Sequence, residues 1–440
     1  MAAETKEKRS LKGYYSITFL IGLGFFTMGL MDPLYDTYVP IFLGKYISSQ
    51  SLIGLVMSLD NLLAIFMIPI FSALSDRTST RIGRRMPYIV TLLPLTALFF
   101  AMIPFSAMDS FIFLVICIFC LNIFKQAVRG PVVALMPDVV PADLRSEANG
   151  VINTMGGLAT ILGTILLARL MDVYIKLPGK EEKVNNILAF PMASIFVIIA
   201  VVLLFIFVKE KKLALKNNGV AAEKEEKAPL FESLKAIFGE KEKSALFILL
   251  SLLCWFIAYQ GILPFIGKYS VEALKTSSGT ASLAAGMVGV AYAIFAVPSG
   301  KVANKYGRKR TIRTALISIV VVLTLVTIHG FALRAFGGDQ PAFIWTLIFW
   351  VLLFFFGIFW VTVVTNSFPM LWQMADYATM GIYTGVYYFF SQLASIISPT
   401  LAGAVIDIAG YPALFVYGIV FMLIAFFLMS KVHRGEAASE

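Results

Sequence analysis

The sequence predicts an all-α integral membrane protein, with twelve transmembrane helices in two pseudo-symmetric six-helix bundles. Composition, a set of long apolar runs and an internal repeat lead to this prediction. Of the 440 residues, 59% are hydrophobic and only 14% are charged, and the mean hydropathy is +0.84. About a quarter of the residues of a soluble protein are charged. A chain this apolar is typical of a protein that lies in a bilayer.

Twelve apolar segments are long enough to cross the bilayer, which takes about 20 residues in a helix. Each is expected to be helical, because lipid offers no hydrogen-bond partner to an open backbone. The segments lie at residues 16–43, 51–74, 87–107, 110–136, 147–171, 188–208, 244–269, 281–300, 312–333, 343–371, 381–408 and 412–430.

Two stretches of the first half of the chain recur in the second half. Residues 72–85, SALSDRTSTRIGRR, correspond to residues 300–309, GKVANKYGRK, with four extra residues in the first copy. Residues 150–172 align without a gap with residues 385–407, and both stretches begin with Gly and end with Asp. Such repeats are typical of transporters.

A segment rich in Lys and Glu separates the two halves. We expect an N-terminal bundle at residues 1–208, a cytoplasmic linker at 209–243 and a C-terminal bundle at 244–440. The linker is interpreted as a solvated segment that ends in a short amphipathic piece at 230–238.

The distribution of cations predicts the orientation. Most of the 36 Lys and Arg lie in segments that are cytoplasmic if both termini are inside, which agrees with the positive-inside rule. The rule accounts for the net charge of +10 without a nucleic-acid partner. We expect a multi-pass plasma-membrane protein, and the absence of an N-x-S/T sequon favours a bacterial inner membrane.

Motifs for nucleotide, hydrolase or metalloprotease chemistry are absent, and the chain has only two His. We therefore expect no enzyme activity, no cofactor and no metal site. Proton transfer, if it occurs, must use a carboxylate. The candidates are Asp32, Asp36 and Asp60, all within apolar segments.

Charges within the spans predict a polar centre. Asp32 and Asp36 lie one turn apart in the first span, Asp60 lies in the second, and Lys125 and Arg129 lie one turn apart in the fourth. An unpaired charge at this depth costs on the order of 3 kcal/mol, so such groups normally face a wet cavity and each other. A purely structural ion-pair network is the alternative. The candidate substrate contacts in this half are Lys125, Arg129, Asn122, Gln126 and, on a polar stripe of the fifth span, Asn153.

The second half offers aromatic rings, amides and hydroxyls in its spans. Rings can pack on the C–H faces of a neutral polyhydroxylated ligand, while amides and hydroxyls bind its hydroxyl groups. Ordinary packing is the alternative for each ring. The candidate substrate contacts are Tyr259, Gln260, Trp360, Asn366, Tyr388 and Gln392.

Three stretches carry a family resemblance. SDRTSTRIGRRMP at 75–87, MPDVVPADLRSEANGVINTMG at 136–156 and YTGVYYFFSQLA at 383–394 resemble the major facilitator superfamily. Within it they resemble the glycoside/pentoside/hexuronide and sucrose-carrier branches of sugar:cation symporters. The resemblance implies two six-helix bundles, the major facilitator fold, with a central cavity that opens alternately to each side.

The resemblance also implies a gate at the first cytoplasmic loop. Asp76 would lie near the start of the eleventh span, and Arg84 or Arg81 would pair with Asp138. The gate residues implied are Asp76, Arg77, Arg81, Arg84 and Asp138.

Departures from the family pattern bear on the transported species. Melibiose-type carriers place acids one turn apart on the second span for sodium, whereas the positions around Asp60 are Val56 and Ala64, which favours a proton. Sucrose carriers have an arginine where this chain has Val133, so sucrose is not specifically indicated.

Three functions remain open from the sequence. The first is a monomeric symporter that couples a proton to a small sugar or glycoside, by alternating access. The second is a carrier of an anionic metabolite or amphipathic drug, with Lys125 and Arg129 as anion receptors. The third is a membrane receptor that transports nothing.

Overall fold

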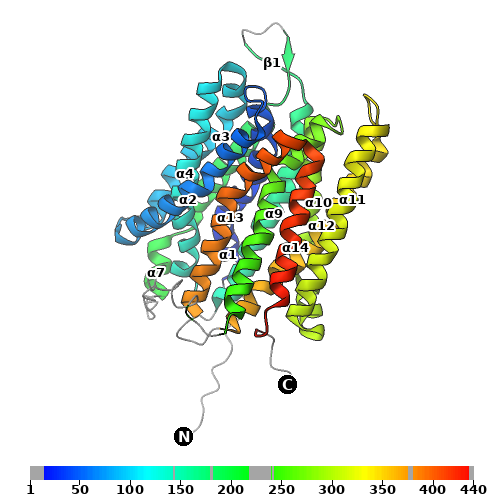
Figure 1. Cartoon of the computed structure of the whole chain (residues 1–440). Helices are drawn as coiled ribbons and strands as arrows, with labels where there is room; N and C mark the ends of the chain where they lie inside the picture. The colour runs from blue at the N-terminus through cyan, green and yellow to red at the C-terminus, as the bar shows by residue number, and fades with distance from the viewer. Residues whose placement is uncertain are drawn as a thin grey trace. The chain divides into compact units, whose positions relative to one another are not determined.

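In the part of the chain that the structure describes, the regular elements are helices apart from one short hairpin (Figure 1). The computed structural model describes residues 14–141, 144–178, 182–217, 239, 242–374 and 380–435. Within these ranges, twelve helices are long and apolar enough to cross a membrane. The predicted all-α membrane fold is therefore confirmed.

The first half of the chain forms six of these spans. Five are α-helices throughout, whereas the fifth span changes its winding after Ile161 and continues as a π-helical turn and a 3₁₀ turn. The elements are α1 (Tyr15–Leu43), α2 (Gln50–Arg77), α3 (Met86–Asp109), α4 (Phe111–Val139), α5 (Arg145–Ile161), the turns Leu162–Leu166 and Leu167–Asp172, the strands β1 (Ile175–Lys176) and β2 (Lys183–Val184), α6 (Ala189–Phe207) and the short α7 (Glu210–Asn217).

The second half forms the other six spans. Gly307 and Gly410 separate neighbouring helices with backbone φ angles of 89° and 78°, a region that favours glycine. The helices are α9 (Ser244–Glu272), α10 (Ser278–Tyr306), α11 (Arg308–Phe336), α12 (Phe343–Trp372), α13 (Met380–Ala409) and α14 (Tyr411–Ser430).

Contacts divide the chain into two compact units. Unit 1 comprises Met1–Leu34 and Leu62–Glu223, and unit 2 comprises Tyr35–Asn61 and Lys224–Glu440. Helices α1 and α2 therefore each contribute one part to each unit. Of the expected linker, only residues 209–217, 239 and 242–243 are described, so the expected amphipathic piece at 230–238 lies outside the described residues.

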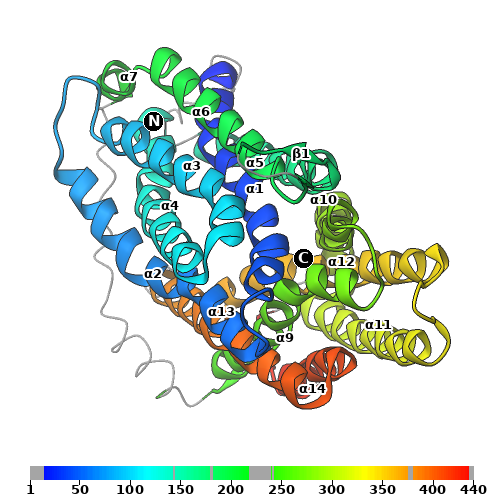
Figure 2. The same cartoon turned by 90° about the horizontal axis from the view of Figure 1, so that it is seen from above.

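In unit 1, α3 packs against both α4 and α6 (Figure 2). The rings of Phe100 and Phe190 lie 4.6 Å apart between α3 and α6, and Ser194 donates a hydrogen bond of 2.7 Å to the carbonyl of Ala97. Close approach of α1 and α5 depends on glycine, because a Cβ on Gly29 would lie 3.1 Å from the Cα of Gly156. Small residues let helix backbones meet in this way within a bilayer.

In unit 2, α9 packs against α13 and α14, and α11 packs against α12 and α14. These helices lie side by side in both views (Figures 1 and 2). The fully buried ring of Tyr269 contacts the rings of Phe349 and Phe415, with centroid distances of 5.1 and 5.4 Å. Aromatic packing of this kind provides much of the core of unit 2.

Residues 35–61 are fixed to the rest of unit 2 by Asp407, near the end of α13. Its carboxylate accepts hydrogen bonds from the hydroxyl of Ser49 at 2.7 Å and from the backbone N–H groups of Gln50 at 2.6 Å and Ser51 at 2.9 Å. These N–H groups begin α2 and have no partner within their own helix. Lys268 of α9 adds a hydrogen bond of 2.8 Å to the side chain of Gln50.

Candidate functional site

The middle of unit 1 holds an ion pair between α1 and α4. The ammonium of Lys125 lies 2.7 Å from the carboxylate of Asp32. Lys125 is only 5% exposed, whereas the side chain of Asp32 is 39% exposed. The pair therefore combines a buried cation with a carboxylate that solvent can reach.

Three other predicted residues of α4 lie beside this pair. Asn122 and Gln126 are fully buried, and the side-chain oxygen of Gln126 accepts no hydrogen bond within the described residues. Arg129 is exposed. The next residue, Gly130, lets α4 approach α2, because a Cβ there would lie 3.0 Å from the carbonyl oxygen of Ile68.

The other two predicted acids belong to unit 2. Asp60 accepts two hydrogen bonds from Asn61, from its backbone at 2.6 Å and its side chain at 2.8 Å. Asp36 interacts electrostatically with Tyr259 of α9. The structure thus brings Asp32 to Lys125, while a single centre that includes all five charges stays a prediction.

Aromatic rings of α9 and α12 form a stack in unit 2. The rings of Tyr259 and Trp360 are nearly parallel, with centroids 4.0 Å apart and an angle of 4°. Phe356 continues the stack at 6.2 Å from Tyr259, and Phe256 meets Trp360 edge to face at 5.5 Å. The stack fixes the orientation of both predicted rings, Tyr259 and Trp360.

The polar candidate substrate contacts of unit 2 differ in how accessible their side chains are to a ligand. Gln260 donates a hydrogen bond of 2.7 Å to Ser395 on α13, and Tyr388 is 58% exposed. Asn366 is 3% exposed and donates to a carbonyl of its own helix. Gln392 is half-buried on α13. Tyr388 is therefore the candidate here whose side chain is most open to a ligand.

Asn153 of unit 1, like Asn366, donates a hydrogen bond within its own helix. Its side-chain amide lies 2.9 Å from the carbonyl of Asn149. The residue is exposed. A substrate contact from Asn153 stays a prediction.

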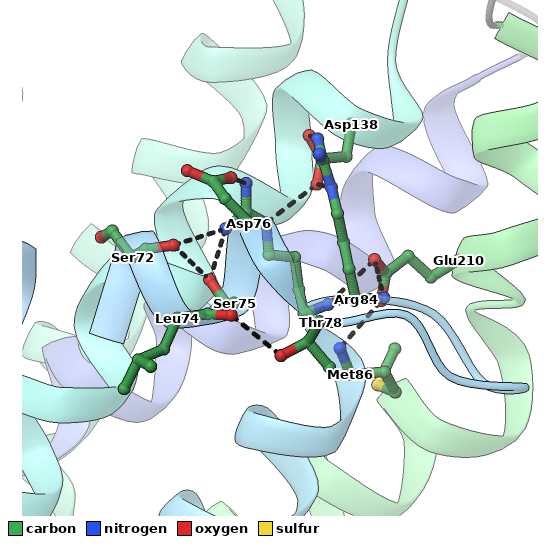
Figure 3. A network of polar contacts seen from close by, with 10 residues as sticks. Ser72, Leu74, Ser75, Asp76, Thr78, Arg84, Met86, Asp138 and Glu210 are labelled. Atoms are coloured by element: carbon green, nitrogen blue, oxygen red, sulfur yellow. Dashed lines mark hydrogen bonds and ion pairs between the residues drawn. The ribbon is translucent and has the colours of Figure 1, made fainter. Parts of the chain in front are cut away.

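A second polar cluster lies at the loop between α2 and α3 (Figure 3). Arg84 donates two hydrogen bonds to Asp138 at the end of α4, one from Nε at 2.7 Å and one from Nη2. The hydrogen bonds to Asp138 raise the pKa of the Arg84 guanidinium above its usual value, so the guanidinium keeps its charge at any physiological pH.

Arg85, which the sequence analysis did not single out as a gate residue, lies at the centre of this cluster. It is 4% exposed and contacts Asp138 at 2.9 Å. It also pairs with Asp76 and donates to the hydroxyl of Ser75 and the carbonyl of Ser72. A buried arginine with this many acceptors fixes the end of α2 to the end of α4.

Glu210, the first residue of α7, was also missed. Its carboxylate accepts hydrogen bonds from the backbone N–H groups of Arg84 at 2.8 Å, Arg85 at 3.0 Å and Met86 at 2.8 Å (Figure 3). It is 1% exposed. The carboxylate therefore caps α3 at the end where a negative charge is favourable. The expected solvated character of the linker does not hold at this residue.

The remaining predicted gate residues, Asp76, Arg77 and Arg81, differ in their contacts and exposure. Arg77 is exposed at the end of α2, and Asp76 accepts from Arg85. The expected position of Asp76 near the start of the eleventh span stays a prediction. Arg81, the alternative partner of Asp138, instead lines a cavity of about 450 Å³, together with Ile82, Met86, Phe205, Val208, Lys209, Lys211 and Lys212.

Comparisons with known proteins agree with this architecture. The family model described as Major Facilitator Superfamily matches residues 17–399 and 269–439. A search of curated proteins found no match.

Several solved structures share the fold at low sequence identity. A bacterial homologue of the iron transporter ferroportin, inward-facing, has a TM-score of 0.71 at 13% identity, over 96% of this chain and 99% of that one. A bacterial homologue of the lysosomal transporter Spinster has a TM-score of 0.70 at 13% identity, over 96% and 97%. A D-xylose–proton symporter has a TM-score of 0.67 at 14% identity, over 96% and 98%.

Proposed function

Since the chain belongs to the Major Facilitator Superfamily, we propose that it is a secondary active transporter that carries a sugar or glycoside together with a proton. Alternating access of two six-helix bundles, at residues 1–208 and 244–440 with a linker at 209–243, would provide the transport cycle. The protein acts as a monomer in this proposal. Both termini are cytoplasmic, in a bacterial inner membrane.

The Asp32–Lys125 pair is the observation that supports proton coupling most directly. Protonation of Asp32, whose side chain is 39% exposed, would remove a counter-ion from the buried ammonium of Lys125. A buried cation that loses its counter-ion is costly, by about 3 to 5 kcal/mol. A substrate oxygen bound by Lys125 would offset this cost, so binding of proton and substrate would favour each other.

Proton coupling also agrees with the surroundings of Asp60. Asp60 has no second acid one turn away on α2, since Val56 and Ala64 occupy those positions, whereas Asp36 has Asp32 one turn away on α1. A sodium ion needs several oxygen ligands, whereas a proton needs one carboxylate. Asp36 and Asp60 are therefore further proton carriers in this proposal, and sodium is not required.

The aromatic stack of unit 2 supports a sugar as the substrate. Tyr259 and Trp360 form a rigid pair of rings, in which Trp360 is only 3% exposed. The hydroxyl groups of a sugar would find donors and acceptors in Gln260, Tyr388 and Gln392. Rings that are already oriented lose little entropy when they bind a ligand.

The loop cluster would act as a gate. Arg84 and Asp138 form an ion pair that alternating access would have to break and remake, and Asp76, Arg77 and Arg81 would take part in the same gate. None of these residues is a substrate contact in this proposal.

Transport in proteoliposomes tests the proposal. A pH gradient, acidic outside, should drive accumulation of a labelled pentose, hexose or glycoside, and a protonophore should abolish it, with or without sodium. Asp32→Asn should abolish accumulation and retain sugar exchange, because exchange needs no net proton movement. Asp109→Asn, at the end of α3, is the matched control and should behave as wild type. Accumulation that survives the protonophore contradicts proton coupling.

Arg129 supports a second candidate function. Lys125 is neutralised by Asp32, whereas exposed Arg129 forms no ion pair within the described residues. A cation of this kind in the middle of a span fits an anionic metabolite or drug. If the substrate is an anion, Arg129→Gln should abolish its transport and leave the protein folded, and neutral sugars should neither bind nor compete.

A further inference from the structure

The first turns of α11 carry a cluster of cations around a cavity of unit 2. The cavity has a volume of about 440 Å³ and lies at the junction of α11 and α14, which pack side by side (Figure 2). The described residues that line it include no carboxylate; they are Lys309, Arg310, Arg313, Thr314, Ile317 and Phe426. A volume of this size admits a phosphate group with its neighbouring atoms.

Arg313 is held in place by an aromatic ring. Its guanidinium carbon lies 4.8 Å from the centre of the Phe426 ring, a cation–π contact that orients the side chain. The Nε atom of Arg313 is buried and donates no hydrogen bond to the described part of the chain. The arginine is therefore oriented with hydrogen-bonding capacity for an acceptor that the protein itself does not supply there.

The start of α11 adds to the positive potential. Gly307, which has no side chain to serve as a cap, precedes the helix. The positive end of the helix dipole thus lies beside three cations. Like charges placed together destabilise a fold unless an anion offsets them.

An apolar stripe continues from the cavity along α11. Ile317, Val321, Leu325 and Ile328 are 39%, 55%, 45% and 58% exposed, and their spacing of three or four residues places them on one helix face. In a membrane this face contacts acyl chains. The cavity lies where the stripe ends and the charges begin, which is the depth of lipid headgroups.

Unit 1 shows that the fold does not need cations at these positions. In the alignment of the two halves, Arg310 and Arg313 correspond to Met86 and Ile89 of α3, which are buried apolar residues. The charges of α11 therefore require another explanation than helix packing.

We propose that this cavity binds the phosphodiester of an anionic membrane phospholipid, with an acyl chain along the Ile317–Val321–Leu325 face. The phosphate oxygens accept hydrogen bonds from Arg310 and Arg313, and Lys309 adds its charge. A lipid fits better than a free phosphate ion, because the cavity opens onto an apolar face that only a lipid would cover.

Native mass spectrometry of the delipidated full chain tests this site. Dioleoylphosphatidylglycerol is titrated against dioleoylphosphatidylcholine, which has the same chains but no net charge, and against inorganic phosphate. Wild type should bind phosphatidylglycerol more tightly than phosphatidylcholine. Each cation near an anionic headgroup contributes about fivefold in affinity. Arg310→Gln should therefore weaken the binding of one phosphatidylglycerol molecule about fivefold. The double variant with Arg310→Gln and Arg313→Gln should weaken it about 30-fold. Adducts at the basic cavity beside Arg81 should persist.

Two controls keep the test decisive. Arg334→Gln removes the same charge from the other end of α11 and should leave lipid binding unchanged. The double variant with Arg310→Lys and Arg313→Lys keeps the charges and should retain most of the selectivity for phosphatidylglycerol. Arg310 is exposed, so Arg310→Gln alone remains informative if the double variant is unstable. Equal binding of both lipids, loss of binding in Arg334→Gln, or binding of phosphate without lipid would overturn the proposal.

Discussion

The two connections that precede α3 and α11 both place a glycine with positive φ before two cations, but the chemistry around these cations differs. Gly83 and Gly307 both have positive φ angles, of 127° and 89°, and each is followed by two cations. In unit 1 those cations are paired with Asp138 and Asp76.

In unit 2 the aligned positions carry no acid. Asp76 is replaced by Asn304, and the residue after the proline of the adjoining helix is Met370 rather than Asp138. Arg308 donates instead to the carbonyl of Pro369 at 3.3 Å. The comparison teaches that a glycine with positive φ can precede such a helix without acids beside it, so the ionic cluster of unit 1 serves a further purpose.

The segments after the sixth and twelfth spans differ in the same way. In unit 1, Glu210 caps α3. In unit 2, the backbone N–H groups of His433 and Arg434 donate to the hydroxyl of Ser244 at the start of α9, at 2.8 and 3.3 Å. The segment after the sixth span thus contacts α3 through a charged side chain. The segment after the twelfth span contacts α9 through the neutral Ser244, beside an ion pair of 3.7 Å between Arg434 and Glu242.

The largest effect is expected for Asp138→Asn. The substitution removes the acid shared by Arg84 and buried Arg85, and breaking a buried pair costs about 3 to 5 kcal/mol. Thermal unfolding in detergent should show a large fall in Tm. The control is Met370→Leu at the aligned position, which should cost less than about 1.5 kcal/mol. Similar losses in both variants would mean that the ionic cluster adds nothing specific.

Glu210→Ala should have the next largest effect. The substitution leaves three backbone N–H groups at the start of α3 without their acceptor, and the loss of charged hydrogen bonds costs about 2 to 3 kcal/mol. Hydrogen exchange should increase at residues 84–86. Lys211→Ala, next in sequence and exposed, is the control. Unchanged exchange at 84–86 in Glu210→Ala would contradict the capping role.

Gly83 and Gly307, the glycines with positive φ before α3 and α11, provide the third comparison. An alanine at either site costs about 1 to 3 kcal/mol for its positive φ. At Gly83 the new Cβ would also lie 2.8 Å from the Cβ of Glu210. Gly83→Ala should therefore lower the Tm more than Gly307→Ala does. The reverse order would show that the packing against Glu210 is loose.

The smallest effect is expected for Ser244→Ala. The hydroxyl of Ser244 accepts two backbone hydrogen bonds, and a neutral bond contributes about 1 kcal/mol. The free energy of unfolding should fall by about half as much as in Glu210→Ala. A loss equal to that of Glu210→Ala would remove the distinction between the charged and the neutral contact.

The fold could be predicted from sequence because a bilayer imposes helices on every long apolar run. Within the described residues, the twelve helices agree with the twelve apolar segments. Hydropathy measures the environment of a segment directly, so these predictions need no knowledge of tertiary contacts.

The ionic cluster was predictable only in part. The structure shows the expected pair of Arg84 and Asp138, because both lie directly at span ends. Arg85 was one cation among four in its loop, and nothing in the sequence distinguished the buried one. Glu210 lies among lysines in a segment typical of solvated linkers, and its burial depends on backbone groups more than 120 residues earlier. Its position just after an apolar span was the only signal available.

The cap that Asp407 places on α2 has a consequence for how the chain is made. Residues 35–61 belong to unit 2, but the ribosome completes them long before α9 to α14 exist. At 5 to 20 residues per second, the nascent chain waits roughly 10 to 40 s for the first of these helices. During that interval the N–H groups at the start of α2 lack the carboxylate that later accepts their hydrogen bonds. Biogenesis of unit 2 is therefore completed only after translation has reached α13.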